Sequence, residues 1–354
     1  QPVATRMATR VATQLFVITL CVGVNSVPLQ EASPIDASRV VRALNADLLA
    51  ANVTWVAGEN LLFSGSNYGL VLARARRLMG AKSLSPHTGT LPERPWAGEV
   101  GEIPDTWNSI TEFAHCPSVA DVWDQGACAS CYVLATVMSA ADRMCVASKG
   151  NLTARLSAEH MLGCCKSCGN GCAGGFPPYA WDWMASHGVV SGGAYGDSTY
   201  CLSYDVKGCE HYQPKKIGPS CAHPAVSPAC PLKCDKNSTW PTPMAHDLVK
   251  FKSSYQVPSD DRSIQVEIMT HASVTAEMNV YSDFLHYKSG VYQALGGEDL
   301  GGHAVRIIGW GTEAGKPYWR VANSWNRDWG DGGYFKILRG NCGINLGVYA
   351  GLYL

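Results

Sequence analysis

The chain has 354 residues, of which 46% are hydrophobic and 16% are charged, and its formal net charge is −1. This length leaves room for more than one compact unit, and the hydrophobic content is ordinary for a globular protein, so nothing argues for disorder. A charge this close to zero gives no reason to expect a nucleic acid or an anionic membrane as partner.

The N-terminal residues predict a secretory signal. Met7 is the expected start, Arg10 supplies a positive charge, and a short apolar core follows over residues 15–24, with small residues for cleavage near Ser26. A membrane anchor is the alternative, but the apolar stretch is too short to span a bilayer comfortably. We therefore expect upstream residues and signal peptide over 1–26, entry into the secretory route, and no stable membrane insertion.

The cysteine content points to an oxidising compartment. Cys21 lies in the expected signal, so 14 of the 15 cysteines remain downstream of it. Such a number in a secreted chain predicts disulfides. The spacings Cys165-x-x-Cys168 and Cys230-x-x-x-Cys234 would also suit zinc, but the signal favours disulfides, and we expect no metal or other cofactor. The sequence alone does not fix which cysteines pair.

The next segment predicts a helix and a linker. Within residues 36–51, apolar residues recur at helical spacing: Val40, Val41, Leu44 and Leu48. Residues 83–101 are rich in Pro, Gly and Ser, which is typical of an exposed linker open to proteolysis. We expect the mature protein to begin near Ile103. The alternative is a flexible N-terminal extension without function.

Helices dominate the following hundred residues or so. The run Val133–Met144 has no Pro or Gly and almost no charge, which predicts a buried helix. Ser157 is expected to cap a helix that continues through Leu162. A further helix is predicted over Pro178–His187, ended by Gly188.

The C-terminal third predicts strands. Residues 201–243 are rich in Pro, Lys and Cys and predict an irregular region held by disulfides. Short β-branched or aromatic segments separated by turns follow: Val274–Val280, Ala304–Trp310, Tyr318–Ala322 and Tyr334–Leu338. One helix is expected over Ser259–Thr270, with Ser259 as its cap. A helical half followed by a strand-rich half predicts an α+β fold, and clefts commonly lie between such halves.

Cys131 stands at the start of the predicted buried helix, in the segment Gln125-Gly126-Ala127-Cys128-Ala129-Ser130-Cys131-Tyr132. A thiol on the first turn faces the positive end of the helix dipole, which favours the nucleophilic thiolate. Far downstream, Gly301-Gly302-His303-Ala304 and Val321-Ala322-Asn323-Ser324-Trp325 offer a base and a group to orient it. Each residue alone has an ordinary explanation as a core or turn residue, and it is their agreement with the motifs of a known family, described next, that favours a catalytic site.

These motifs resemble those of the papain-type cysteine peptidases, and among them the cathepsin B group. Family members usually read Gln-Gly-Ser-Cys-Gly-Ser-Cys-Trp, so this chain departs from them at Ala127, Ala129 and Tyr132. The resemblance covers nearly everything after about residue 36. It implies a papain-like two-lobed fold with a helical left lobe and a β-barrel-like right lobe. It also implies an inhibitory propeptide and linker over 27–102 and a peptidase domain over 103–354.

The resemblance assigns catalytic roles. Cys131 would be the nucleophile, and His303 would give a proton to the leaving amine. Asn323 would fix the tautomer of His303, and Trp325 would shield the bond between them from water. Gln125, together with the backbone N–H of Cys131, would hold the oxyanion. The implied activity is endopeptidase cleavage through a thioester acyl-enzyme.

The resemblance also implies substrate-binding residues. Gly174 and Gly175 match the wall along which the substrate backbone lies extended, where glycine permits close approach. The cathepsin B group typically reads Cys-Gly-Ile-Glu-Ser-Glu where this chain reads Cys342-Gly343-Ile344-Asn345-Leu346-Gly347. The last Glu of that motif accepts a basic side chain at the second residue upstream of the cut. With Gly347 in its place, we expect apolar side chains to be preferred there.

For the cysteines, the resemblance suggests six disulfides: Cys116–Cys145, Cys128–Cys172, Cys164–Cys230, Cys165–Cys168, Cys201–Cys234 and Cys209–Cys221. Cys131 and Cys342 remain outside these pairs. Cys131 is then the reactive thiol, and Cys342 is expected to be a small buried apolar residue.

The segment Cys209–Tyr212, closed by Cys221, resembles the occluding loop of the cathepsin B group, within the region of about 201–234. In that group, two adjacent histidines on the loop bind the C-terminal carboxylate of the substrate. His211 matches the first, but Tyr212 replaces the second. We therefore expect weakened release of C-terminal dipeptides.

Asp124 occupies the position whose carboxylate pairs with the first histidine and holds the loop down. This latch to His211 requires a protonated imidazole, so it should loosen as the pH rises towards neutral. A ratio of endopeptidase to exopeptidase activity that does not change with pH would argue against it.

The implied partners are peptide and protein substrates, the chain's own propeptide as inhibitor, and protein inhibitors of cysteine peptidases. The implied location is a lysosome-like compartment or the outside of the cell. Asn52, Asn151 and Asn237 each begin a glycosylation sequon.

Two alternatives stay open. One is a catalytically impaired papain-fold scaffold or binding protein, suggested by Ala129, Tyr132 and Tyr212. The other is a redox pair formed by Cys128 and Cys131, which requires that Cys128 be unbound to Cys172.

Overall fold

A computed structural model describes residues 37–64, 68–82, 91–95, 101–209 and 223–353. The expected signal over 1–26 and residues 27–36 lie outside this part of the chain. Within it, no helix combines the length and apolar character needed to cross a membrane.

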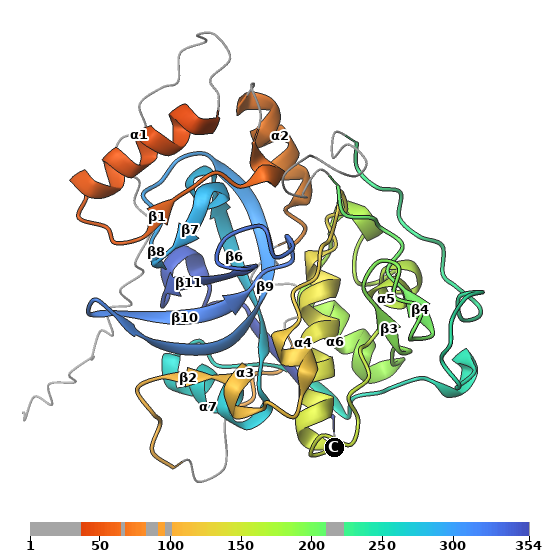
Figure 1. Cartoon of the computed structure of the whole chain (residues 1–354). Helices are drawn as coiled ribbons and strands as arrows, with labels where there is room; N and C mark the ends of the chain where they lie inside the picture. The colour runs from red at the N-terminus through yellow and green to blue at the C-terminus, as the bar shows by residue number, and fades with distance from the viewer. Residues whose placement is uncertain (1–36, 65–67, 83–90, 96–100, 210–222, 354) are drawn as a thin grey trace, which may run out of the picture.

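The described residues form a helical lobe and a strand lobe, so the α+β prediction is confirmed (Figure 1). The helical lobe contains α3 (Ser109–Glu112), α4 (Cys131–Ala147), α5 (Ala158–Cys164), α6 (Pro177–Ser186) and the short strands β3 (Gly192–Gly193) and β4 (Leu202–Ser203). The strand lobe contains β2 (Trp107–Asn108), β5 (Ser253–Gln256), α7 (Asp261–His271), β6 (Val274–Tyr281), β7 (Tyr287–Ser289), β8 (Val291–Tyr292), β9 (Asp299–Glu313), β10 (Lys316–Ala322), β11 (Tyr334–Leu338) and β12 (Val348–Leu352).

The main sheet follows the order β5-β12-β6-β9-β10-β11-β8, with β2 added beside β9. Its neighbours run antiparallel except for β11 and β8. In the β6–β9 register, Met278 pairs with His303 and Glu277 pairs with Ala304. This pairing places Glu277 and Met278 of β6 directly beside Ala304 and His303 of β9, at the edge of the candidate site.

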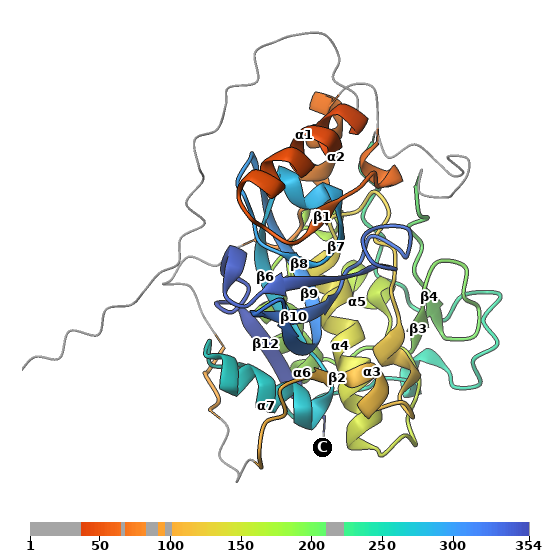
Figure 2. The same cartoon turned by 60° about the vertical axis from the view of Figure 1, so that its left-hand side comes forward.

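The N-terminal residues form α1 (Ala37–Ala50), β1 (Val56–Ala57) and α2 (Tyr68–Leu78), which lie over the strand lobe in both views (Figures 1 and 2). Apolar residues from these elements, including Trp55, Phe63 and Leu78, are buried in one cluster with the strand lobe. The N-terminal region is therefore packed onto the strand lobe. A second large cluster fills the helical lobe.

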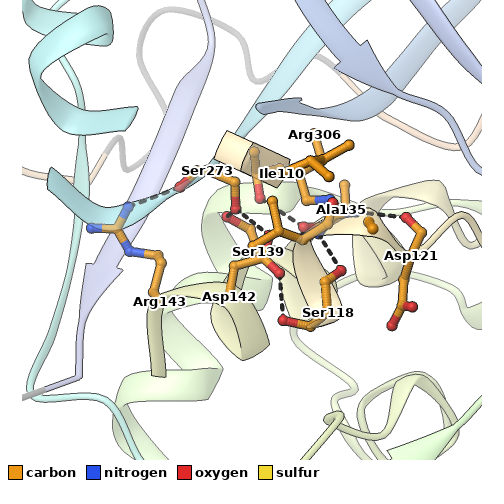
Figure 3. A network of polar contacts seen from close by, with 12 residues as sticks. Ile110, Ser118, Asp121, Ala135, Ser139, Asp142, Arg143, Ser273 and Arg306 are labelled. Atoms are coloured by element: carbon orange, nitrogen blue, oxygen red, sulfur yellow. Dashed lines mark hydrogen bonds and ion pairs between the residues drawn. The ribbon is translucent and has the colours of Figure 1, made fainter. Parts of the chain in front are cut away.

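Helix α4 is buried along nearly its whole length, as the sequence predicted. Its carboxylate Asp142 accepts hydrogen bonds from Ser118 and Ser273 and forms an ion pair with Arg306 of β9 (Figure 3). A buried charge is tolerated only when it is paired and hydrogen-bonded. The network therefore fixes α4 against β9, which carries the candidate histidine.

Several predicted boundaries need correction. Ser259 does not cap α7, because the side chain of Asp260 accepts the N–H of Ser263 at 2.9 Å. Strand β9 begins at Asp299, well before the predicted Ala304, because its pairing with β6 continues to that end. Strands β5 and β12, which pair with each other, were not predicted.

Other boundaries match the prediction closely. Strand β11 has the predicted bounds, and Ser157 caps α5 by accepting the N–H of His160 at 3.0 Å. Helix α6 ends at Ser186, just before Gly188, whose φ of +85° favours glycine.

Candidate active site

Cys131 is the first residue of α4 and is fully buried, and its sulfur takes part in no disulfide. The backbone N–H of Ala304, the residue after His303, donates to Sγ of Cys131 at 3.5 Å. The thiol of the helical lobe therefore lies against the histidine-bearing strand of the other lobe. Cys128 is bonded to Cys172, which excludes the redox-pair alternative.

His303 is buried on β9 and is held by Asn323, which follows β10. Nε2 of His303 lies 2.8 Å from Oδ1 of Asn323, and the N–H of Ser324 donates to the same oxygen at 2.8 Å. An amide oxygen only accepts, so Nε2 must carry the hydrogen. Nδ1 is then the basic nitrogen, and among the described residues it has no hydrogen-bond partner.

Trp325 covers the imidazole. Its ring stacks on His303 with centroids 4.8 Å apart and planes at 25°, and it is itself fully buried. Phe63 from the N-terminal region packs edge-on against Trp325 at 5.1 Å. Water is therefore kept from the His303–Asn323 bond on this side.

Gln125 presents a fixed donor. Its Oε1 accepts the hydroxyl of Ser324 at 2.7 Å, which orients the amide so that Nε2 points the other way. Nε2 donates to the carbonyls of Leu78 and Cys128, each at 2.9 Å. Leu78 is the last residue of α2, so the candidate oxyanion donor already holds a peptide carbonyl.

The segment 78–82 runs across Cys131 between two walls. On one side Gly175 donates to the carbonyl of Gly80 at 2.8 Å and accepts the N–H of Lys82 at 2.9 Å. On the other side the N–H of Ala81 donates to Gly302 at 3.1 Å. These contacts resemble the pairing of an added strand, so the site accommodates an extended peptide backbone.

Gly80 makes the closest approach to the site. A Cβ on Gly80 would lie 2.1 Å from the carbonyl oxygen of Ala129 and 3.0 Å from Sγ of Cys131. Gly174 faces it from the wall with φ of +90°, and a Cβ there would lie 2.8 Å from the Gly80 oxygen. Only glycine fits at this contact.

Burial under this segment sets the protonation of the pair. Desolvation raises the pKa of Cys131 to about 11, although the N–H groups of Ala304, Gly80 and Tyr132 oppose the rise. Desolvation also lowers the pKa of His303 to about 4, against the effect of its bond to Asn323. In the covered site, burial therefore favours the neutral thiol and the neutral imidazole.

A family model described as papain family cysteine protease matches residues 103–352. The chain belongs to the papain family of cysteine proteases. It is 42% identical over 254 residues to the cathepsin B-like cysteine proteinase of Schistosoma japonicum, covering 71% of this chain and 73% of the relative. It is 40% identical over 280 residues to cathepsin B-like cysteine proteinase 4 of Caenorhabditis elegans, covering 78% and 83%. It is therefore a cysteine peptidase, a hydrolase.

Solved structures of procathepsins have the same fold. Procathepsin B S9 from Trypanosoma congolense superposes with a TM-score of 0.73 at 31% identity, covering 90% of this chain and 99% of the other. Procathepsin L 3 of Tenebrio molitor, at 20% identity and a TM-score of 0.64, shares the fold alone. The segment 78–82 seated over Cys131 agrees with this likeness, so the chain has the arrangement of a protease zymogen.

Tyr132, which departs from the tryptophan usual in the cysteine proteases, supports the glycine wall. Its hydroxyl donates to the carbonyl of Gly171 at 3.3 Å. A Cβ on Gly175 would lie 2.6 Å from the Tyr132 ring. An aromatic side chain therefore still lies beneath the backbone that contacts the peptide.

The occluding-loop residues His211, Tyr212 and Cys221 lie outside the described residues. Asp124, the expected latch, accepts the N–H of Gly126 at 2.8 Å and the side-chain amide of Asn326 at 3.3 Å. Five of the expected disulfides are present: Cys116–Cys145, Cys128–Cys172, Cys164–Cys230, Cys165–Cys168 and Cys201–Cys234. Disulfides in this number are typical of proteins of the secretory route.

Sequence reasoning missed three contributors to the site. Ser324 orients Gln125, and its position directly after Asn323 was an available signal. Gly80 lies in Met79-Gly80-Ala81, where nothing local marks a contact with Cys131. Glu277, whose N–H donates to Gly347 at 2.9 Å, is far from that glycine in the sequence.

Proposed function

We propose that this cysteine protease is an endopeptidase in which Cys131 and His303 form the catalytic pair once residues 78–82 leave the cleft. The observation that carries the proposal is the peptide backbone seated in the site. Its Leu78 carbonyl meets Nε2 of Gln125, and its Gly80 lies against Sγ of Cys131. The same cleft would receive an extended substrate.

Departure of the segment would let water reach the site and weaken the desolvation that keeps both groups neutral. The proton of Cys131 then passes to Nδ1 of His303, and the thiolate attacks the carbonyl carbon of the scissile bond. Nε2 of Gln125 and the N–H of Cys131 hold the oxyanion. Asn323 keeps the hydrogen on Nε2, so that Nδ1 is the nitrogen that exchanges protons.

As the tetrahedral intermediate collapses, His303 gives its proton to the leaving amine and a thioester remains on Cys131. His303 then takes a proton from water, and the hydroxide attacks the thioester. Return of this proton to the sulfur releases the acid product and restores the starting pair. Each half of the reaction uses the same oxyanion donors.

The Gln125→Ala variant tests this proposal. Loss of one oxyanion donor should lower kcat about 10²–10³-fold while KM changes little, because the interaction forms only in the transition state. The measurement is hydrolysis of an internal bond in a fluorogenic peptide by protein freed of its propeptide. Gln293→Ala is the matched control, since that side chain contacts Lys316 instead. Equal kcat in the two variants would rule out the role of Gln125.

We also propose that Tyr212 weakens the release of C-terminal dipeptides. A neutral hydroxyl replaces the charge-assisted bond that a histidine would make to the substrate carboxylate. Tyr212→His should therefore raise dipeptide release roughly 5–30-fold, which corresponds to about 1–2 kcal/mol. A peptide with an amidated C-terminus serves as the control, because its cleavage should not change. Unaltered dipeptide release would dismiss the idea.

A further inference from the structure

A carboxylate lies against Gly347, the position where the cathepsin B group carries its glutamate. Glu277 projects from β6, and a Cβ on Gly347 would lie 2.8 Å from its Oε2 and 3.2 Å from its Cβ. The side chain of Glu277 thus takes up the space that a side chain at 347 would need.

Glu277 lies close to the candidate nucleophile. It pairs across the sheet with Ala304, whose N–H donates to Sγ of Cys131. Its charge makes a small contribution to the raised pKa of the Cys131 thiol, and it also helps raise the pKa of Tyr349. Glu277 therefore lies beside the nucleophile, on the side where Gly347 is expected to line the pocket for the second residue upstream of the cut.

Among the described residues, the carboxylate of Glu277 lacks polar partners. Its Oε1 atom is buried and has no hydrogen-bond partner among the described residues. Glu277 also forms no ion pair with any of these residues. Burial raises the pKa of Glu277 to about 8. A buried carboxylate without a partner destabilises a fold, so a cation supplied from outside would relieve it.

We propose that Glu277 makes this protease prefer substrates with Arg or Lys at the second residue upstream of the cut. The inference rests on the proposed function and names its substrate class. It reverses the apolar preference expected from Gly347 alone, because the carboxylate lost at 347 is supplied from β6. The basic side chain would enter beside Gly347 and pair with Oε1 and Oε2 of Glu277.

The test compares two fluorogenic peptides that differ only in carrying Arg or Phe at this residue. The wild-type protease should cleave the Arg peptide more efficiently. In Glu277→Gln, which keeps the volume and removes the charge, the ratio of the two kcat/KM values should fall about 10-fold or more. Cleavage of the Phe peptide should fall much less than cleavage of the Arg peptide.

A double variant provides the rescue. Glu277→Ala together with Gly347→Glu returns a carboxylate to the pocket from the other side, and it should restore part of the preference for Arg. An unchanged ratio in Glu277→Gln would overturn the inference, as would an equal loss for both peptides, which would indicate a structural role.

A binding experiment separates a failure of the proposed function from a failure of this inference. If the wild-type protein cleaves neither peptide, calorimetry on the Cys131→Ala variant measures the Kd of each peptide directly. If Cys131→Ala binds the Arg peptide more tightly than the Phe peptide, and adding Glu277→Gln removes this difference, the preference for a basic side chain is supported even though the protein is not catalytic. Equal affinities would overturn it.

Discussion

Replacing Cys131 by serine should lower peptide hydrolysis by about 10⁴-fold or more while leaving the fold intact. The two side chains differ by one atom, and the bond from Ala304 can form to either. A hydroxyl, however, is a far weaker acid than a thiol, so beside His303 it stays un-ionised, whereas a thiol gives up its proton much more readily. The rate is measured as kcat/KM on propeptide-free protein, with folding checked by circular dichroism.

Cys342→Ser is the matched control for this variant. Cys342 is the other described cysteine outside a disulfide, and it is also buried. Its hydrolysis rate should stay near that of the wild type. Full activity in Cys131→Ser, or loss confined to Cys342→Ser, would assign the nucleophile elsewhere.

Replacing Gly80 by alanine should open the covered site. The added Cβ would lie 2.1 Å from the carbonyl oxygen and 2.6 Å from the carbonyl carbon of Ala129, and backbone atoms cannot move aside as a side-chain end can. Overpacking of this kind costs about 1–3 kcal/mol, so the blocked state should weaken roughly 5–150-fold. The measurement is the rate at which iodoacetamide alkylates Cys131 in the full-length, uncleaved chain.

Gly101→Ala is the control, because a Cβ on Gly101 has no atom within 4 Å. Alkylation in this variant should match the wild type, where the raised pKa of Cys131 keeps the thiol protonated and slow to react. Equal rates for Gly80→Ala and Gly101→Ala would mean that the segment does not restrain access to Cys131.

The sequence predicted those features that depend on the pattern of neighbouring residues. The apolar run after Cys131 predicted α4, and β11 was predicted at its observed bounds because its aromatic and β-branched residues are closed by turns on both sides. The Cys131, His303, Asn323 and Gln125 motifs were recognisable one by one. The structure adds the contacts between them, such as the Ser324 hydroxyl that orients Gln125.

The missing parts depend on contacts between distant segments. The N-terminal region meets the site through backbone groups of Leu78, Gly80 and Ala81, which leave no side-chain pattern to read. The helix dipole at Cys131 is a local argument, whereas the groups packed against the sulfur come from distant segments, among them Gly80 and Ala304. Glu277 was read as one residue of a strand, because its contact with Gly347 exists only once β6 and β12 pair.

The central claim is that one thiol, Cys131, performs the hydrolysis. Titration of the propeptide-free protein with a thiol-directed epoxide tests it most directly, with the adduct located by mass spectrometry. Activity should fall to zero as one equivalent binds, with the label on Cys131 and no label taken up by Cys131→Ala. Hydrolysis that survives full labelling of Cys131, or inactivation with the label on Cys342, would contradict the account.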